Sequence, residues 1–151
     1  MQVNIAFIII SSIILIDQLT KYFAYVYIRP KAKTKNKIFY LSYVENSGMA
    51  MGKLSGAYIY FYIVTIISLI ALAFYANYID FQNRLIFSIG ISILMGGAMG
   101  NFLDRVFRGY VIDFITGKIF KKHLPVYNIS DLCIMIGFIL LIIDIIGVLL
   151  S

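Results

Sequence analysis

Residues 57–76 form a run of twenty positions without a charged side chain, and this run limits the possible folds more than any other feature. A helix of about 20 apolar residues matches the hydrocarbon thickness of a bilayer. Similar apolar segments occupy about residues 3–28, 85–104 and 131–150. Hydrophobic residues make up 62% of the 151 positions and charged residues 13%, against ~25% charged residues in soluble domains. We therefore expect an all-α integral membrane protein, a single domain over residues 1–151 with four transmembrane helices.

The segment after the first helix, about residues 31–52, is expected to be extended. Pro30 ends the helix, and lysines alternate at positions 31, 33, 35 and 37, which places them on one side of an extended chain. Such a basic edge suits contact with anionic lipid headgroups. The other long connection, residues 105–128, contains Pro125 and is expected to be a polar connection long enough to hold functional groups.

Four crossings bring the end of the first helix, the start of the second, the end of the third and the start of the fourth to one membrane face. The polar residues at these four places should therefore gather there. They are Asp17, Lys21, Asn46, Asn101, Asp104, Arg105, Asp113, Asn128 and Asp131. Asp144 lies thirteen residues after Asp131, or about 20 Å along a helix, so it should reach the opposite face, near Asp80 and Arg84.

The chemistry open to this cluster is acid–base chemistry by carboxylates. His123 is the only histidine and no HExxH motif is present, while Cys133 points away from Asp131 on a helix. Two aspartates held close together, such as Asp113 and Asp131, share a proton, so that one can activate water while the other donates to a carbonyl. An alternative stays open at this point, in which the acidic residues only neutralise neighbouring basic ones, as Asp17 and Lys21 can do at i and i+4.

Five short motifs follow one another in a fixed order along the chain. They are Asp17-Gln18-x-x-Lys21, Asn46-x-Gly48-x-Ala50-x-Gly52, Gly96-Gly97-Ala98-x-Gly100-Asn101-x-x-Asp104-Arg105, Val111-x-Asp113-Phe114 and Pro125-x-x-Asn128-x-x-Asp131. Each motif alone is weak, but the ordered set, with the four apolar segments, resembles the lipoprotein signal peptidase family, the type II signal peptidases. The resemblance covers nearly the whole chain.

The resemblance implies an aspartyl endopeptidase of the bacterial cytoplasmic membrane. Members remove the signal peptide of a prolipoprotein by cutting before its diacylglyceryl-modified cysteine. It implies that Asp113 and Asp131 are the catalytic pair. It also implies supporting or substrate-binding roles for Asn46, Gly48, Asn101, Arg105, Asn128, Asp17, Lys21 and Asp104.

The same resemblance carries further expectations about structure and partners. The extended segment after the first helix should form a small β-sheet on the membrane, and the active site should open at the extracytoplasmic leaflet. Prolipoprotein signal peptides and membrane lipids are the expected partners, and nucleic acid is not. No metal or organic cofactor is implied, and the peptide antibiotic globomycin is an expected inhibitor.

Two features depart from the family pattern or conflict with it. Ser130 stands where the family usually has alanine, and its hydroxyl is expected to alter the shared proton of the catalytic pair or the position of the substrate. The second feature is the distribution of Lys and Arg, which by the positive-inside rule would place the polar cluster in the cytoplasm. We follow the resemblance for the orientation.

Two other functions fit the sequence less well. One is a non-catalytic membrane protein that binds lipopeptides with the same fold. The other is a carrier subunit that uses Asp17, Lys21 and Asp144 as a pathway, although a carrier would distribute its charges through the bilayer depth.

Overall fold

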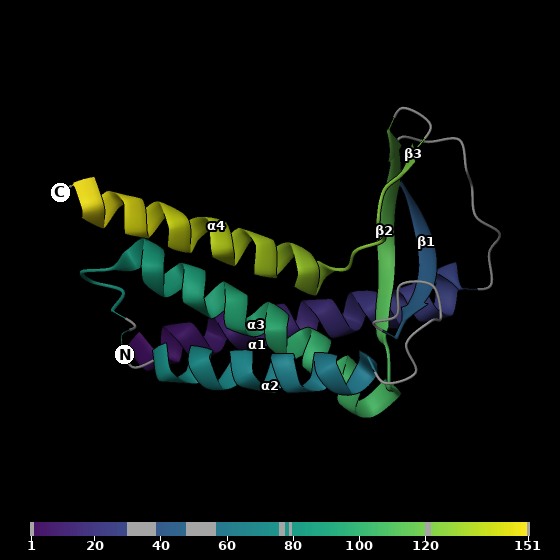
Figure 1. Cartoon of the computed structure of the whole chain (residues 1–151), viewed down its shortest axis with the longest axis horizontal. Coiled ribbons are helices and arrows are strands. Elements are labelled where there is room, and N and C mark those ends of the chain that lie inside the picture. The colour runs from purple at the N-terminus through teal and green to yellow at the C-terminus, as the bar shows by residue number, and fades with distance from the viewer. Residues whose placement is uncertain are drawn as a thin grey trace.

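The computed structural model describes residues 2–29, 39–47, 57–75, 78, 80–119 and 122–150. Its elements are α1 (Gln2–Phe23), the π-helical turn η1 (Ala24–Ile28), β1 (Phe39–Asn46), α2 (Ala57–Tyr75), α3 (Leu85–Arg108), β2 (Val111–Ile119), β3 (Lys122–His123) and α4 (Ile129–Leu150). Figure 1 shows the helices running side by side, with the sheet standing across one end of the bundle and both termini at the other. The predicted helices are present with slightly different bounds, and the described part of the predicted extended segment forms β1. The alternating lysines at positions 31, 33, 35 and 37 lie outside the described residues.

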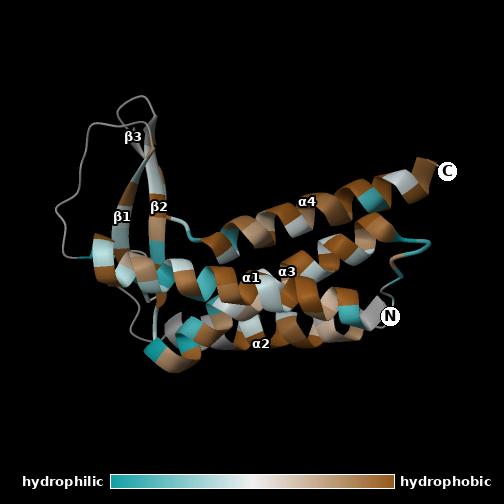
Figure 2. Cartoon of the chain, turned by 180° about the vertical axis from the view of Figure 1, so that it is seen from behind, coloured by the Kyte–Doolittle hydropathy of each residue, from teal (hydrophilic) through white to brown (hydrophobic). Residues whose placement is uncertain are grey.

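Helix α3 is the centre of the bundle, because it packs against α1, α2 and α4. It buries a face made largely of small residues together with Ile91 and Leu94. The outer faces of the helices expose large apolar side chains, and Figure 2 shows hydrophobic residues along most of their length. This arrangement, with small residues inside and large apolar residues outside, is typical of helices packed in lipid.

Three helical segments are long and apolar enough to cross a membrane, counted over the described residues. They are Asn4–Ile28, Leu85–Arg108 and Ile129–Leu150. Helix α2 has 19 residues and lies beside them, so a fourth crossing through α2 stays a prediction. A membrane protein follows from the three segments that qualify.

The sheet corrects the expectation for residues 105–128, which was wrong at two places. Helix α3 continues to Arg108 and ends where Gly109 adopts a left-handed conformation, with φ of 78°. After this turn, Val111–Ile119 forms β2, which pairs antiparallel with β1 and with the two-residue β3. The fold is therefore mostly helical with a three-stranded antiparallel sheet, and the extended segment after α1 finds its partner about 70 residues later.

Glycines of α3 and α4 allow close contact between the helices. A Cβ atom at Gly96 would lie 2.9 Å from Cβ of Ile13 in α1, and one at Gly97 would lie 2.6 Å from the Ser130 carbonyl oxygen. A Cβ at Gly100 would lie 2.2 Å from the Ser130 hydroxyl and 2.7 Å from Asp17 Oδ2. The small residues of α3 therefore bring α1 and α4 close to each other at the polar end of the bundle.

We expect Gly100→Ala to destabilise the protein by about 1–3 kcal/mol, because the added methyl group overlaps two buried polar groups. Gly147→Ala in α4 is the matched control, since a Cβ there meets nothing within 4 Å among the described residues and alanine favours a helix. Thermal unfolding in detergent measures both. Equal midpoints for the two variants would contradict this account of the packing.

Candidate active site

The two aspartates expected to react are held by asparagine side chains from β1, from α3 and from the residue before α4. Asp113 lies on β2, where its Oδ2 accepts a hydrogen bond from Asn46 Nδ2 of β1 at 2.8 Å and its Oδ1 accepts one from Asn128 Nδ2 at 2.6 Å. Asp131 lies in the first turn of α4, and its Oδ1 accepts a hydrogen bond from Asn101 Nδ2 of α3 at 2.8 Å. Asn128 joins the two halves, because its Nδ2 also contacts Asn101 Oδ1 at 3.2 Å.

Asp131 has a second set of contacts that fixes the start of α4. The Asn128 N–H donates to Asp131 Oδ2 at 3.1 Å, and the Asp131 N–H donates to Asn128 Oδ1 at 2.9 Å. This reciprocal pair is a capping box, which satisfies two backbone donors at a helix N-terminus. All four oxygens of Asp113 and Asp131 therefore accept a hydrogen bond, and both carboxylates are fixed in direction.

The Asn101 amide can have only one orientation. Lys21 Nζ donates to Asn101 Oδ1 at 3.0 Å, and an ammonium group has no acceptor. The oxygen of Asn101 must therefore face Lys21, and its NH₂ group must face Asp131. A buried cation thus fixes the hydrogen-bond donor that contacts one of the two aspartates.

Lys21 is also the centre of an ion cluster that supports the backbone next to both aspartates. Its Nζ lies 2.7 Å from Asp17 Oδ2 and 3.0 Å from Asp104 Oδ2, and all three side chains are fully buried. Asp17 accepts the N–H of Ser130, the residue before Asp131, at 2.9 Å. Asp104 accepts the N–H of Ile112, the residue before Asp113, at 3.1 Å. Neutralisation of charge and support of the site are therefore performed by the same groups.

Two further residues belong to this cluster, and the sequence interpretation did not assign a site role to either. Gln18 donates from Nε2 to Asp17, to Asp104 Oδ1 and to the Gly100 carbonyl, at 3.1–3.2 Å. Arg108 pairs with Asp104 Oδ1 and donates to Gln18 Oε1 at 2.9 Å. Gln18 follows Asp17 directly in the first motif, so the motif itself was the available signal. We call Asp17, Gln18, Lys21, Asp104 and Arg108 the Lys21 cluster.

Burial raises the pKa of Asp113 from 3.8 to about 6. The hydrogen bonds from Asn46 and Asn128 and the charge of Lys21 lower this pKa, while the charge of Asp131 raises it. Desolvation exceeds the stabilisation of the charged form, so the Asp113 carboxyl keeps its proton to a higher pH than a solvent-exposed aspartate does.

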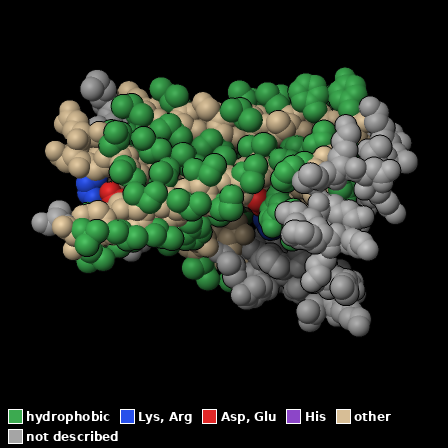
Figure 3. All heavy atoms as spheres, turned by 90° about the horizontal axis from the view of Figure 1, so that it is seen from above, with side chains coloured by type: hydrophobic (Ala, Val, Ile, Leu, Met, Phe, Trp, Pro, Cys, Tyr) green, Lys and Arg blue, Asp and Glu red, His purple; other side chains and the backbone are tan. Residues whose placement is uncertain are grey.

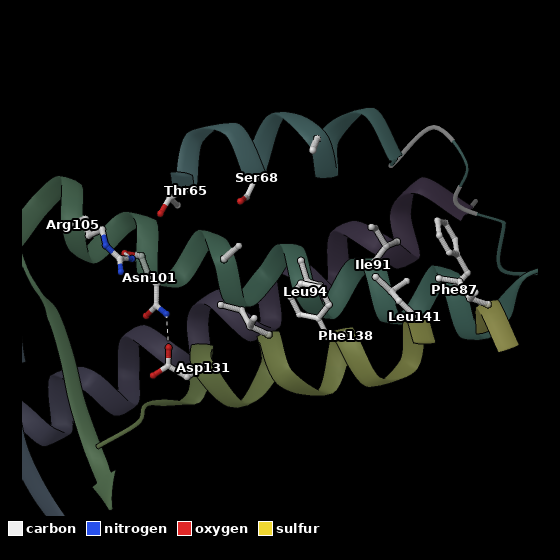
Figure 4. A pocket seen from close by; sticks show the side chains of 14 residues that line it. Thr65, Ser68, Phe87, Ile91, Leu94, Asn101, Arg105, Asp131, Phe138 and Leu141 are labelled. Atoms are coloured by element: carbon white, nitrogen blue, oxygen red, sulfur yellow. Dashed lines mark hydrogen bonds between the residues drawn. The ribbon is translucent and has the colours of Figure 1, made fainter. Parts of the chain in front are cut away.

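An apolar groove of about 610 Å³ opens beside Asp131 and extends along the helices. Figure 4 shows Arg105, Asn101 and Asp131 at one end of the groove, Leu94 and Phe138 further along it, and Phe87 at the far end. Among the described residues α2 packs on α3 and not on α4, which leaves the groove open between α2 and α4. Arg105 donates to the Asn101 carbonyl oxygen at 3.1 Å, which holds its guanidinium group at the polar end.

The structure brings together all but one of the residues named for the site. Gly48 lies outside the described residues. Ser130 is fully buried, and its hydroxyl occupies the space next to Gly100 and Asp17. The Ser130 hydroxyl therefore lies next to the Lys21 cluster, and we expect it to affect that cluster more directly than the proton shared by Asp113 and Asp131. Asp144 lies at the other end of α4, as expected, and pairs with Arg84.

Known proteins share both the sequence and the fold of this chain. The sequence model of the signal peptidase (SPase) II family matches residues 9–147. A lipoprotein signal peptidase of Halalkalibacterium halodurans is 36% identical over 141 residues, which is 91% of this chain and 90% of the relative. A lipoprotein signal peptidase of a bovine strain of Staphylococcus aureus is 41% identical over 134 residues, covering 87% of this chain and 81% of the relative. A solved bacterial membrane enzyme is 38% identical and superposes with a TM-score of 0.80 over 94% of this chain and 92% of that one.

Proposed function

Because this chain belongs to the signal peptidase II family, we propose that it removes the signal peptide of prolipoproteins, with Asp113 and Asp131 as its reacting groups. The family establishes a protease of the lipoprotein signal peptidase type in a bacterial membrane. The observation that carries the proposed mechanism is a pair of asparagine-bound carboxylates, of which Asp113 is buried and Asp131 is half-buried at the mouth of an apolar groove. A binding protein without activity would not need two carboxylates fixed by the same asparagine, Asn128.

The proposed reaction is direct attack of water on the scissile carbonyl. In the active form the pair carries one proton, because two carboxylates this close do not ionise together easily. The ionised carboxylate takes a proton from water as the oxygen attacks the carbonyl carbon, and the protonated carboxyl donates to the carbonyl oxygen. The tetrahedral gem-diol then collapses. The carboxyl that took the proton from water gives it to the leaving nitrogen as the C–N bond breaks, and the other carboxylate takes a proton from a gem-diol hydroxyl as the carbonyl re-forms, which returns the pair to its starting state.

The groove supports a position for the substrate. Its walls between the polar end and the far end are apolar and include Leu94 and Leu141, which suits the apolar segment of a signal peptide. Arg105 lies at the polar end, where it can contact peptide carbonyl groups. The lipid chains on the substrate cysteine would then face the bilayer near Asp131. Four crossings, with the site at the extracytoplasmic leaflet where lipidated precursors arrive, are part of this proposal, and so is inhibition by globomycin.

The experiment that tests the function uses the purified chain in detergent with a synthetic diacylated signal peptide that contains the cleavage sequence. We expect hydrolysis of the bond before the lipidated cysteine, a loss of cleavage with globomycin, and no cleavage of the same peptide without its diacylglyceryl group. Binding of the lipidated peptide without hydrolysis, by a folded protein, would favour the non-catalytic binding function instead.

We expect the pH profile of kcat/KM to fall on its alkaline side with a midpoint near 6 in the free enzyme. The raised pKa of Asp113 is the reason, since loss of the shared proton removes the acid that protonates the carbonyl oxygen. Asn46→Ala removes a hydrogen bond that favours ionised Asp113, so the alkaline midpoint should move to higher pH. The profile is measured from initial rates at low substrate concentration, and an Asn46→Ala midpoint that stays unchanged or moves to lower pH would contradict this assignment.

A further inference from the structure

The groove that begins at Asp131 ends beside a second, separate charged site. Phe87 lines its far end, and the Arg84 guanidinium carbon lies 4.7 Å above the Phe87 ring. Arg84 also pairs with Asp144 of α4, which precedes the groove residue Ile145. Figure 3 shows charged side chains reaching the surface at two places on one face of the molecule, with hydrophobic side chains between them.

The Asp144 carboxylate keeps one oxygen available for a further partner. The contact with Arg84 uses Oδ2, while Oδ1 accepts no hydrogen bond from any residue that the structure describes. The Asp144 side chain is 9% exposed and the Arg84 side chain 43%, so the carboxylate is the more enclosed member of the pair. A carboxylate can accept from several donors at once, so a second cation can share it.

The charge at this end of the molecule is opposite in sign to that of the whole chain. Asp80 and Asp144 outnumber Arg84 there, in a protein with a formal net charge of +6. The distance between the two ends of the groove can be obtained from the length of α4 between the two aspartates. Thirteen residues separate Asp131 from Asp144, which is about 20 Å of helix.

A signal peptide has the dimensions and the charge to match both ends of the groove. Its apolar region has about 7–15 residues and is preceded by a positively charged region. With the cleavage site at Asp131 and the apolar region helical in the groove, the basic region comes to lie at Asp144. The acyl chains of the substrate would also fit an apolar groove, but they carry no charge that Asp144 could recognise.

We propose that Asp144, at the far end of the groove, binds the basic N-terminal region of the prolipoprotein signal peptide and shares its carboxylate between Arg84 and the peptide's lysine or arginine. The inference rests on the proposed function and adds a recognition site about 20 Å from the reacting groups. Asp144 is then a specificity-determining residue, and Arg84 is a competitor that holds the carboxylate in place when the groove is empty.

The test compares two synthetic diacylated signal peptides that differ only in the N-terminal region, three lysines in one and three glutamines in the other. For the lysine peptide we expect Asp144→Asn to raise KM about fivefold with kcat unchanged, and Arg84→Gln to lower KM. For the glutamine peptide wild type and Asp144→Asn should have the same KM. Asp80→Asn removes the same charge at the same end but outside the groove, so it should raise KM for the lysine peptide less than Asp144→Asn does and leave KM for the glutamine peptide unchanged.

Several outcomes would overturn the inference. If the Arg84–Asp144 ion pair is only structural, Asp144→Asn and Arg84→Gln should both lower the rate of cleavage, and to the same extent with either peptide. Thermal midpoints of all variants identify that case. A KM that depends on acyl-chain length but not on the lysines would assign the groove to the lipid. If folded wild type cuts neither peptide, the proposed function itself fails, whereas cleavage of both without dependence on charge rejects only the role of Asp144.

Discussion

Asp113→Asn and Asp131→Asn are each expected to lower kcat by about 10³-fold, because asparagine has nearly the shape of aspartate but cannot accept or donate the reacting proton. The loss should be similar for the two variants and should not increase much in the double variant, since residues that act as one unit are not additive. Cleavage of the diacylated peptide, followed under single-turnover conditions, measures the chemical step directly.

The stability of the two variants must be measured as well, because every oxygen of the pair accepts a hydrogen bond. An asparagine at position 113 turns an NH₂ group toward Asn46 or Asn128, and two donors then face each other. We expect a loss of about 1 kcal/mol in the free energy of unfolding, too small to unfold the protein. Glu45→Gln is the matched control, since Glu45 pairs with the exposed Arg29 away from the pair.

Two results would reject this assignment. A folded Asp113→Asn or Asp131→Asn protein that cuts at the wild-type rate would remove that residue from the reaction. Loss of activity in folded Asp104→Asn alone would place the chemistry in the Lys21 cluster.

Lys21→Met is expected to be the most destabilising substitution in the chain, at about 3–5 kcal/mol. The change leaves Asp17 and Asp104 fully buried without their shared cation and leaves the Asn101 oxygen with one donor fewer. Both carboxylates support backbone next to a reacting aspartate, so activity should fall with stability. Thermal and denaturant unfolding in detergent, together with the cleavage rate, measure the two effects.

Arg108→Gln provides the control for Lys21→Met, because both basic residues contact Asp104. The Arg108 side chain is 32% exposed, and a partly exposed pair contributes less than ~1 kcal/mol. The double variant Lys21→Met/Asp104→Asn should recover part of the stability, since it removes one of the two uncompensated charges. Equal losses in the free energy of unfolding for Lys21→Met and Arg108→Gln would show that burial does not determine how much each basic residue contributes to stability.

The helices could be predicted from the sequence because their signal is local. Apolar length alone placed four helices close to the observed ones, although α3 continues four residues beyond its predicted end to Arg108. Strand β2 was missed because a strand is defined by its partner. Val111–Ile119 pairs with β1, and helices α2 and α3 separate the two strands in the sequence. The residues around Asp113 do not indicate this distant partner.

The candidate site divides in the same way between what was predictable and what was not. Counting crossings was enough to gather the polar residues at one end of the bundle, and the structure brings them together. The directions of the contacts were not predictable. Asn128 both caps α4 and binds Asp113, while Asp17 and Asp104 accept backbone N–H groups. These contacts depend on the close approach of the helices that Gly97 and Gly100 allow.

The order in which the site's residues occur along the chain has a consequence for biosynthesis. Asp113 meets Asn46 once β2 has paired with β1, but its second partner, Asn128, and the other carboxyl, Asp131, arrive only with α4. A chain grows from its N-terminus at about 5–20 residues per second, so several seconds separate the first helix from the fourth. With Asp113 and Asp131 as the proposed reacting groups, we expect a nascent chain to be unable to hydrolyse peptides in the surrounding membrane until α4 has joined the bundle.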